Sequence, residues 1–187
     1  MVSFPIHTAQ SAPEAARAAL EGAQKSLGFI PNLYAVLAEN PAVLEAYQTL
    51  AGIFAKAGFS PVEQQLIPLI VSVENGCGFC VGAHSAIATM HKVSPDIVNA
   101  VRQASPIHDR KLEALRTFTR KVIQERGFAA DADVAAFLEA GYTKAHVLGV
   151  VLGVAWKTVS NYANHLAETP LNDAFAQFAW TPPARAA

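Results

Sequence analysis

Apolar residues recur at intervals of three and four along almost the whole chain, and this spacing is the strongest constraint on the fold. Residues three and four apart share one face of an α-helix, whereas a half-buried strand alternates apolar and polar residues. No run of four or more strictly alternating residues is flanked by hairpin turn signals. We therefore predict an all-α fold, a helical bundle.

Helix start and stop signals divide the chain into segments. Ser60 and Glu63 in the sequence SPVE have the spacing of a capping box. Asn40 is followed by Pro41, which is favoured at the first helical position, and Gly28 follows the end of another apolar pattern. The first expected helix opens at Ser11, Pro13 and Glu14 and ends before Gly28. The others cover residues 40–57, 60 up to the cysteines, 77–90, 94–104, 106–127, 131–141 and 143–167.

The length and composition indicate one domain that associates with copies of itself. A chain of 187 residues is long enough for one well-buried domain and short for two. We expect this domain to span residues 1–180, followed by a disordered tail at residues 181–187. Apolar residues make up 52% of the chain and charged residues 16%, which is more apolar than an ordinary soluble monomer needs. We therefore expect a homo-oligomer.

The charge balance argues against nucleic acid and membranes as partners. Lys and Arg number 14 and Asp and Glu 15, so there is no basic field to attract anionic polymers or lipids. The longest strongly apolar stretch, at residues 145–156, is shorter than the roughly 20 residues that cross a bilayer. The N-terminus has no basic segment before an apolar core. We expect a cytoplasmic protein.

The two cysteines of the chain, Cys77 and Cys80, lie in the sequence VENGCGFCVGAH, which ends at His84. In a reducing compartment this spacing favours a catalytic or metal-binding pair over a structural disulfide. If residues 77–90 are helical, a rotation of about 100° per residue places the three side chains on one face. The first turn of a helix carries free N–H groups and a partial positive charge, which favour a thiolate.

This pattern predicts a redox-active dithiol. His84 can take the thiol proton, and the resulting imidazolium would stabilise the thiolate. The second thiol can attack a sulfenic acid formed on the first, which closes a disulfide that an external dithiol must reopen. We expect Gly78, Gly82 and Ala83 to leave room for a substrate beside the pair, and Phe79, between the cysteines, to shape an apolar entry.

Two other interpretations of the cysteines remain open. Free cysteines are often simply buried and inert. Alternatively, Cys77, Cys80 and His84 could bind zinc with Glu74 as the fourth ligand. We favour the redox interpretation, with no metal or cofactor. Asn161, Asn164 and His165 in the sequence NYANH could line a pocket, and we favour capping or subunit-contact roles for them.

Residues 59–88, FSPVEQQLIPLIVSVENGCGFCVGAHSAIA, resemble the core motif of the carboxymuconolactone decarboxylase superfamily, in its AhpD-like alkylhydroperoxidase branch. That branch carries an Asn-x-Cys-x-x-Cys-x-x-x-His pattern, which is matched here by Asn75, Cys77, Cys80 and His84. Residues 156–180 also resemble the C-terminal segment of uncharacterised members. The resemblance implies an all-α fold that assembles into trimers or hexamers.

The resemblance also implies a thiol-dependent peroxidase that reduces organic hydroperoxides. Carried over to this chain, Cys80 is oxidised by the peroxide, and Cys77 resolves it and accepts electrons from a dithiol donor such as a lipoylated protein. His84 would be the proton relay.

This chain departs from the branch at one position. The branch commonly has Glu twelve residues before the first cysteine, where this chain has Gln65, which cannot act as a base at neutral pH. We expect Glu74 to supply the carboxylate, with Glu63, or a relay through His84 alone, as alternatives.

Two further function classes compete with the peroxidase. One is the cofactor-free decarboxylase or lyase activity for which the superfamily is named, acting on a small carboxylated ring. That activity does not use a CxxC pair, so the presence of both cysteines argues against it. The other is a non-catalytic redox-sensing or zinc-binding protein.

Overall fold

The computed structural model describes residues 3–182, and every regular element in that range is helical. The elements are α1 (Glu14–Leu27), α2 (Asn32–Leu37), α3 (Pro41–Phe54), α4 (Pro61–Glu74), α5 (Gly78–Met90), α6 (Pro95–Arg102), α7 (Arg110–Gln124), α8 (Asp131–Glu139), α9 (Lys144–Ala167) and the 3-10 helix η1 (Asp173–Phe178). The all-α prediction is confirmed. Residues 183–187 of the expected tail lie outside the described residues.

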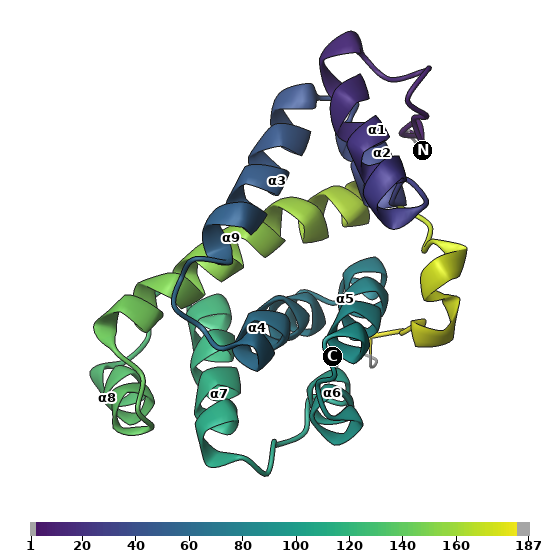
Figure 1. The fold of residues 1–187 in the computed structure, drawn as a ribbon. Coiled ribbons are helices and arrows are strands. Elements are labelled where there is room, and N and C mark those ends of the chain that lie inside the picture. Colours follow the sequence, from purple (N-terminus) through teal and green to yellow (C-terminus); the bar gives the residue numbers. More distant parts are fainter. Residues whose placement is uncertain (1–2, 183–187) are drawn as a thin grey trace.

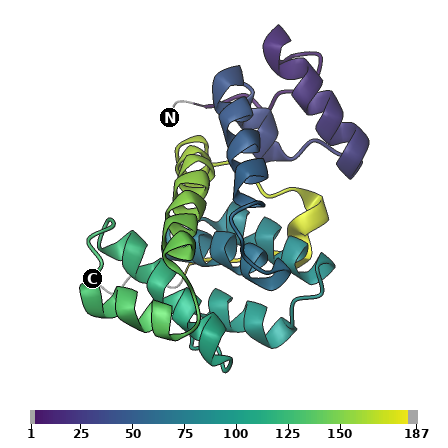
Figure 2. The same cartoon turned by 60° about the vertical axis from the view of Figure 1, so that its left-hand side comes forward.

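Helix α9 runs across the molecule and connects its two halves (Figure 1). Helices α1–α3 lie on one side of it and α4–α8 on the other, a division that Figure 2 shows from a second direction. Helix α9 packs against α3 and α4 and also contacts α2, α5 and α7. Side chains of α9 can therefore contribute to a site shared by both halves. No helix within residues 3–182 is long and apolar enough to span a membrane.

The local capping signals form as the sequence predicts. Ser60 Oγ accepts from the Glu63 backbone N–H at 3.3 Å, and a Glu63 carboxylate oxygen accepts from the Ser60 N–H at 2.7 Å. The Asn40 side chain accepts from Ala42 N, and Gly28 ends α1 with a left-handed φ of 82°. These caps satisfy backbone groups that a helix end leaves unpaired. Helix α3 is shorter than expected and ends at Phe54.

Two glycines let α9 lie directly on its neighbours. A Cβ atom at Gly153 would lie 2.6 Å from Ile67 Cγ2 in α4, and one at Gly149 would lie 2.7 Å from a ring carbon of Phe59. Any larger residue there would force the helices apart. This close packing fixes the C-terminal half of α9 beside the junction between α4 and α5.

After α9 the chain turns back and crosses α5, and we call residues 169–182 the C-terminal strap (Figure 1, yellow). Arg102 of α6 donates to the carbonyl oxygens of Phe178 at 3.0 Å and Ala179 at 3.1 Å. The Trp180 indole N–H donates to the Arg102 carbonyl oxygen at 3.0 Å. These bonds fasten the strap to the helices beneath it.

The strap occupies the space beside the two glycines of α5. A Cβ atom at Gly78 would lie 2.9 Å from the Trp180 carbonyl oxygen, and one at Gly82 would lie 3.0 Å from Leu171 Cδ1. The expectation that Gly78 and Gly82 leave room for a substrate is therefore wrong. They are small because backbone and side chains of the strap pack against them.

Candidate active site

The turn between α4 and α5 places the two thiols at a helix N-terminus. Gly76 has a φ of +70°, and this turn lets the Cys77 N–H donate to the Ser72 carbonyl oxygen at 2.9 Å. Cys77 is the N-cap of α5 and Cys80 lies in its first turn, as expected for a reactive pair. Both thiols are free and only 1% exposed.

Helix α9 presents a row of polar groups to these sulfur atoms. The Asn164 amide nitrogen lies 3.3 Å from Cys80 Sγ and 3.8 Å from Cys77 Sγ. Lys157 Nζ and Ser160 Oγ each lie 3.7 Å from Cys80 Sγ. Cys80 is thus surrounded by groups that can donate hydrogen bonds to a thiolate.

Sequence reasoning missed this contribution of α9. The sequence favours a capping or contact role over a pocket-lining one for Asn164 and does not single out Lys157. A usable signal was present, because Lys157, Ser160, Asn161 and Asn164 are spaced to share one face of an otherwise apolar helix. All four are buried. Asn161 also accepts a hydrogen bond from Asn75 at 2.9 Å, which ties the start of the cysteine motif to α9.

The surroundings separate the two thiols in acidity. Burial alone would raise the pKa of Cys80, but the hydrogen bond from Cys77 and the positive charge of Lys157 together hold that pKa well below its usual value. The hydrogen bond to Cys80, followed by burial, raises the pKa of Cys77. Cys80 is therefore the more acidic thiol of the pair.

His84 lies beside the thiols as a neutral ring. Burial, and then the charge of Lys157, lower the pKa of His84 well below its usual value. Its side chain is 7% exposed, and its Nδ1 atom has no hydrogen-bond partner within residues 3–182. Its ring meets Trp156 edge-on, with centroids 5.8 Å apart. The structure therefore does not support the expected imidazolium, since the cation beside Cys80 is Lys157.

A cavity of about 480 Å³ opens onto this site. Its walls are mainly apolar and include Phe29, Tyr34 and Phe175 from outside α5. Phe79 and Ala83 also line it. Cys80, His84 and Lys157 line the cavity, whereas Cys77 is absent from its wall. A molecule in the cavity would therefore meet Cys80 first.

The structure does not bring Glu74 to the thiols. Its carboxylate is bound by Arg120 and by Gln124, both on α7, the second at 2.9 Å. The physical reason is the sharp turn at Gly76, after which the chain runs in a new direction, so that spacing from Cys77 does not translate into a shared face. The expected role of Glu74 as the proton-handling carboxylate is therefore not supported.

Glu63 and Gln65 also lie away from the dithiol. Glu63 is held in the capping box and accepts a hydrogen bond from the Tyr142 hydroxyl at 2.8 Å. Although burial acts to raise the pKa of Glu63, hydrogen bonds from Ser60 and Tyr142 lower it overall, so the group is a fixed carboxylate. Gln65 is half-buried on α4 and does not line the cavity. No carboxylate among the cavity-lining residues replaces the one missing at position 65.

The zinc alternative finds no support in the geometry. Nowhere in the described range are three His, Cys, Asp or Glu side chains gathered as metal ligands. Glu74, the expected fourth ligand, is instead bound to Arg120.

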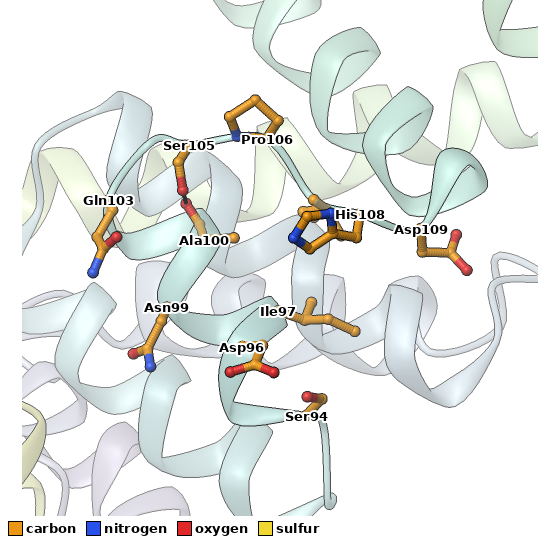
Figure 3. Close-up of a pocket in the computed structure, with 11 residues that line it drawn as sticks. Ser94, Asp96, Ile97, Asn99, Ala100, Gln103, Ser105, Pro106, His108 and Asp109 are labelled. Atoms are coloured by element: carbon orange, nitrogen blue, oxygen red, sulfur yellow. Dashed lines mark hydrogen bonds between the residues drawn. The ribbon is translucent and has the colours of Figure 1, made fainter.

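A second hollow, of about 530 Å³, lies between α6 and the segment that leads to α7. Figure 3 shows its polar lining, with Asp96 and Asn99 on α6 and His108 and Asp109 across from them. No thiol or amine is among its lining residues. The candidate chemistry therefore belongs to the cavity at Cys80.

Comparisons with known proteins agree with this motif and fold. The model of the carboxymuconolactone decarboxylase family matches residues 41–120. Alkyl hydroperoxide reductase AhpD of Solibacter usitatus (strain Ellin6076) is 40% identical over 57 residues, which are 30% of this chain and 32% of that protein. The match thus spans less than a third of the length of this curated relative.

Solved structures share the fold over nearly the whole chain. An uncharacterised peroxidase-related protein from Ralstonia eutropha JMP134, described as an AhpD core, has a TM-score of 0.81 at 24% identity, covering 92% of this chain and 93% of its own. Another peroxidase-related protein, from Silicibacter sp. TM1040, has a TM-score of 0.79 at 18% identity, with 93% and 92% covered. The debrominase Bmp8, as a variant in complex with 2,3,4-tribromopyrrole, has a TM-score of 0.77 at 19% identity, with 95% of each chain covered.

The family match covers the helices that carry Asn75, Cys77, Cys80 and His84, and the structural likeness extends the same fold through α9. Residues 41–120 thus match the carboxymuconolactone decarboxylase family, and the chain shares the fold of the solved AhpD core.

Proposed function

We propose that this protein is a thiol-dependent reductase of organic hydroperoxides that works through Cys80 and Cys77. One observation carries the proposal: Cys80 Sγ borders the cavity, 3.7 Å from the Lys157 ammonium group and 3.3 Å from the Asn164 amide, while Cys77 lies behind it. This arrangement favours a thiolate on Cys80 at the cavity wall, with the Cys77 thiol available to attack Cys80 once it is oxidised.

The reaction follows from this order of the two thiols. The Cys80 thiolate attacks the terminal oxygen of a hydroperoxide, the O–O bond breaks, and Cys80 becomes a sulfenic acid as an alcohol leaves. Cys77 then attacks the Cys80 sulfur, which forms a disulfide and releases water. An external dithiol reduces the disulfide by exchange.

The cavity walls favour an organic peroxide over hydrogen peroxide. Aromatic rings such as Phe29 and Phe175 would bury the apolar part of a substrate and gain hydrophobic stabilisation. The unpartnered Nδ1 atom of neutral His84 is suited to hydrogen-bond the polar peroxide group. Hydrogen peroxide offers no apolar surface to these walls.

We propose that the electron donor carries its dithiol on a long, narrow and flexible group. Cys77 and Cys80 are each only 1% exposed, so a donor must reach them through the cavity. A lipoyl group fits this requirement better than a dithiol fixed on a protein surface. We also propose a homo-oligomer, because Leu148, Tyr162 and Leu166 are exposed along α9.

Steady-state turnover tests this proposal. Reduced protein is mixed with cumene hydroperoxide and dihydrolipoamide, and peroxide loss is compared among wild type, Cys77→Ser and Cys80→Ser. The proposal expects sustained turnover in the wild type and none in either variant. Absence of turnover with every organic hydroperoxide and dithiol pair would contradict it, as would full turnover in Cys80→Ser.

Reductive dehalogenation of an aromatic ring is the second candidate. It is favoured by the aromatic cavity walls and by the likeness to a debrominase solved with a brominated pyrrole. The same dithiol would supply two electrons, and the ring would exchange bromide for a proton. Release of bromide from 2,3,4-tribromopyrrole in place of peroxide loss, in the assay above, would favour this activity.

A further inference from the structure

Lys157 is a buried cation whose surroundings contain no carboxylate partner. Its side chain is fully buried on α9, with Nζ 5.0 Å from the ring centre of Trp156 and 5.6 Å from that of Tyr47. Among the residues that the structure describes, no Asp or Glu forms an ion pair with it. An ammonium group in such a place needs a compensating anion. The nearby group that can supply one is Cys80, 3.7 Å away.

The other titratable groups around Cys80 are poorly suited to deliver a proton during the reaction. His84 is neutral, and burial raises the pKa of Tyr47, which keeps its phenol protonated. The Cys77 thiol is needed for the next step. Asn164 and Ser160 have no proton that they release near neutral pH. Lys157 alone combines contact with the reacting sulfur, a place on the cavity wall and a transferable proton.

We infer that Lys157 is a catalytic acid that pairs with the Cys80 thiolate and then protonates the departing alkoxide. This inference rests on the proposed hydroperoxide reductase function and adds the group that takes the place of a carboxylate in the proton transfers. It also explains why no carboxylate needs to reach the dithiol.

The protons and electrons balance through the cycle. The reduced site holds a Cys77 thiol, a Cys80 thiolate and a Lys157 ammonium. Attack on ROOH forms Cys80–SOH and RO⁻, and Lys157 gives RO⁻ its proton, which leaves ROH and a neutral amine.

The amine then takes the Cys77 thiol proton. The new Cys77 thiolate displaces hydroxide from Cys80–SOH, and the hydroxide recovers that proton to form water. The products are ROH, water, the disulfide and a neutral Lys157, and the two electrons that break the O–O bond come from the two sulfur atoms. Lys157 is therefore charged while Cys80 is a thiolate and neutral once the disulfide has formed.

A comparison of two peroxides separates proton donation from thiolate stabilisation. The tert-butoxide leaving group of tert-butyl hydroperoxide needs a proton, whereas the acetate leaving group of peracetic acid does not. Single-turnover oxidation rates are measured for wild type and for Lys157→Met, which keeps the length of the side chain without its charge. The mutation lowers the oxidation rate by some factor with each peroxide. Any change in the fraction of Cys80 that is ionised affects both factors equally, so it cancels when one factor is divided by the other.

The expected loss in Lys157→Met is larger with tert-butyl hydroperoxide than with peracetic acid by about 100-fold, the usual contribution of a general acid. Equal losses with the two peroxides would overturn the acid role. No reaction of the wild type with either peroxide would overturn the proposed function itself, and this inference with it. Lys144→Met, the same change at an exposed position of α9, is the control and should keep wild-type rates.

The ion pair has a test that needs no peroxide. In a Cys77→Ser background, the pH midpoint of Cys80 alkylation by iodoacetamide should rise when Lys157 becomes Met, and it should not rise with Lys144→Met. An unchanged midpoint would overturn the pairing. Lys157→Gln provides a second neutral variant if circular dichroism shows that Lys157→Met does not fold.

Discussion

The Asn164 amide nitrogen lies 3.3 Å from Cys80 Sγ and 3.8 Å from Cys77 Sγ, so one side chain of α9 touches both sulfur atoms. Its nitrogen faces the thiols, and its Oδ1 atom is buried with no hydrogen-bond partner within the described residues. An amide that turns its donor side to a sulfur atom favours the thiolate over the thiol. Asn164 and Lys157 are therefore both placed to stabilise a thiolate on Cys80.

Replacing Asn164 should make Cys80 less acidic. In Asn164→Leu the pH midpoint of Cys80 alkylation should rise by about one unit, because a hydrogen bond to a charged group contributes about 1.5–3 kcal/mol. The measurement is the iodoacetamide rate against pH in a Cys77→Ser background. The neighbouring exposed change His165→Ala is the control, and an equal midpoint in both variants would argue against a role for the amide.

His84 should make the protein less stable in mild acid. The unfolded chain binds a proton on this ring below about pH 6.5, whereas the folded protein binds it only at lower pH because burial, and then Lys157, lower the pKa of His84. The unfolded state thus holds more protons as the pH falls, and stability is lost below pH 6.5, by up to about 1.4 kcal/mol per pH unit.

Urea unfolding between pH 7 and pH 5 measures this effect. His84→Gln should lose less stability over that range than the wild type, since it removes the titrating ring. His91→Gln, at an exposed position, should follow the wild type. An identical pH dependence in His84→Gln would show that the ring is not held neutral by its site.

A methyl group at Gly82 should loosen the C-terminal strap. In Gly82→Ala the new Cβ would lie 3.0 Å and 3.2 Å from the two methyl carbons of Leu171, so the free energy of unfolding should fall by about 1–3 kcal/mol. Gly22→Ala in α1 meets nothing within 4 Å and should instead be stabilising by about 0.5–1 kcal/mol. Urea denaturation compares the two, and equal effects would contradict close packing of the strap on α5.

Glu74 should matter for stability and not for thiol chemistry. In Glu74→Gln the charge-assisted contact with Arg120 is lost, so unfolding should become easier by about 1–3 kcal/mol. The rate of Cys80 alkylation should stay within about twofold of wild type, since the hydrogen bond from Cys77 and the charge of Lys157, rather than Glu74, lower the pKa of Cys80 against the effect of burial. A large fall in that rate at unchanged stability would show that Glu74 takes part in the thiol chemistry.

The parts of the fold that depend on local chemistry could be predicted from the sequence. The box at Ser60 and Glu63, the cap at Asn40 and the stop at Gly28 form as expected because each uses groups within a few residues. Helix α2 was not predicted, because it is short and is tied to the strap by the bond from the Asn32 N–H to the Asn172 side chain, 140 residues away.

The site likewise contains residues that the sequence could place and residues that only the tertiary packing brings to it. Cys77, Cys80 and His84 stand in one stretch, and their placement at the start of α5 follows from helix geometry. Lys157 and Asn164 come from 77 and 84 residues beyond Cys80, and only the packing of α9 brings them there. The neutral state of His84 depends on burial, which spacing does not reveal.

Mapping the oxidised cysteines after a single turnover tests the central claim most directly. Reduced protein is treated with one equivalent of cumene hydroperoxide, and its thiols are located by mass spectrometry after alkylation. The account predicts a Cys77–Cys80 disulfide in the wild type, a sulfenic acid trapped on Cys80 in Cys77→Ser, and an unreacted Cys77 thiol in Cys80→Ser. Two intact thiols in the treated wild type, or a sulfenic acid on Cys77 in Cys80→Ser at the wild-type rate, would contradict it.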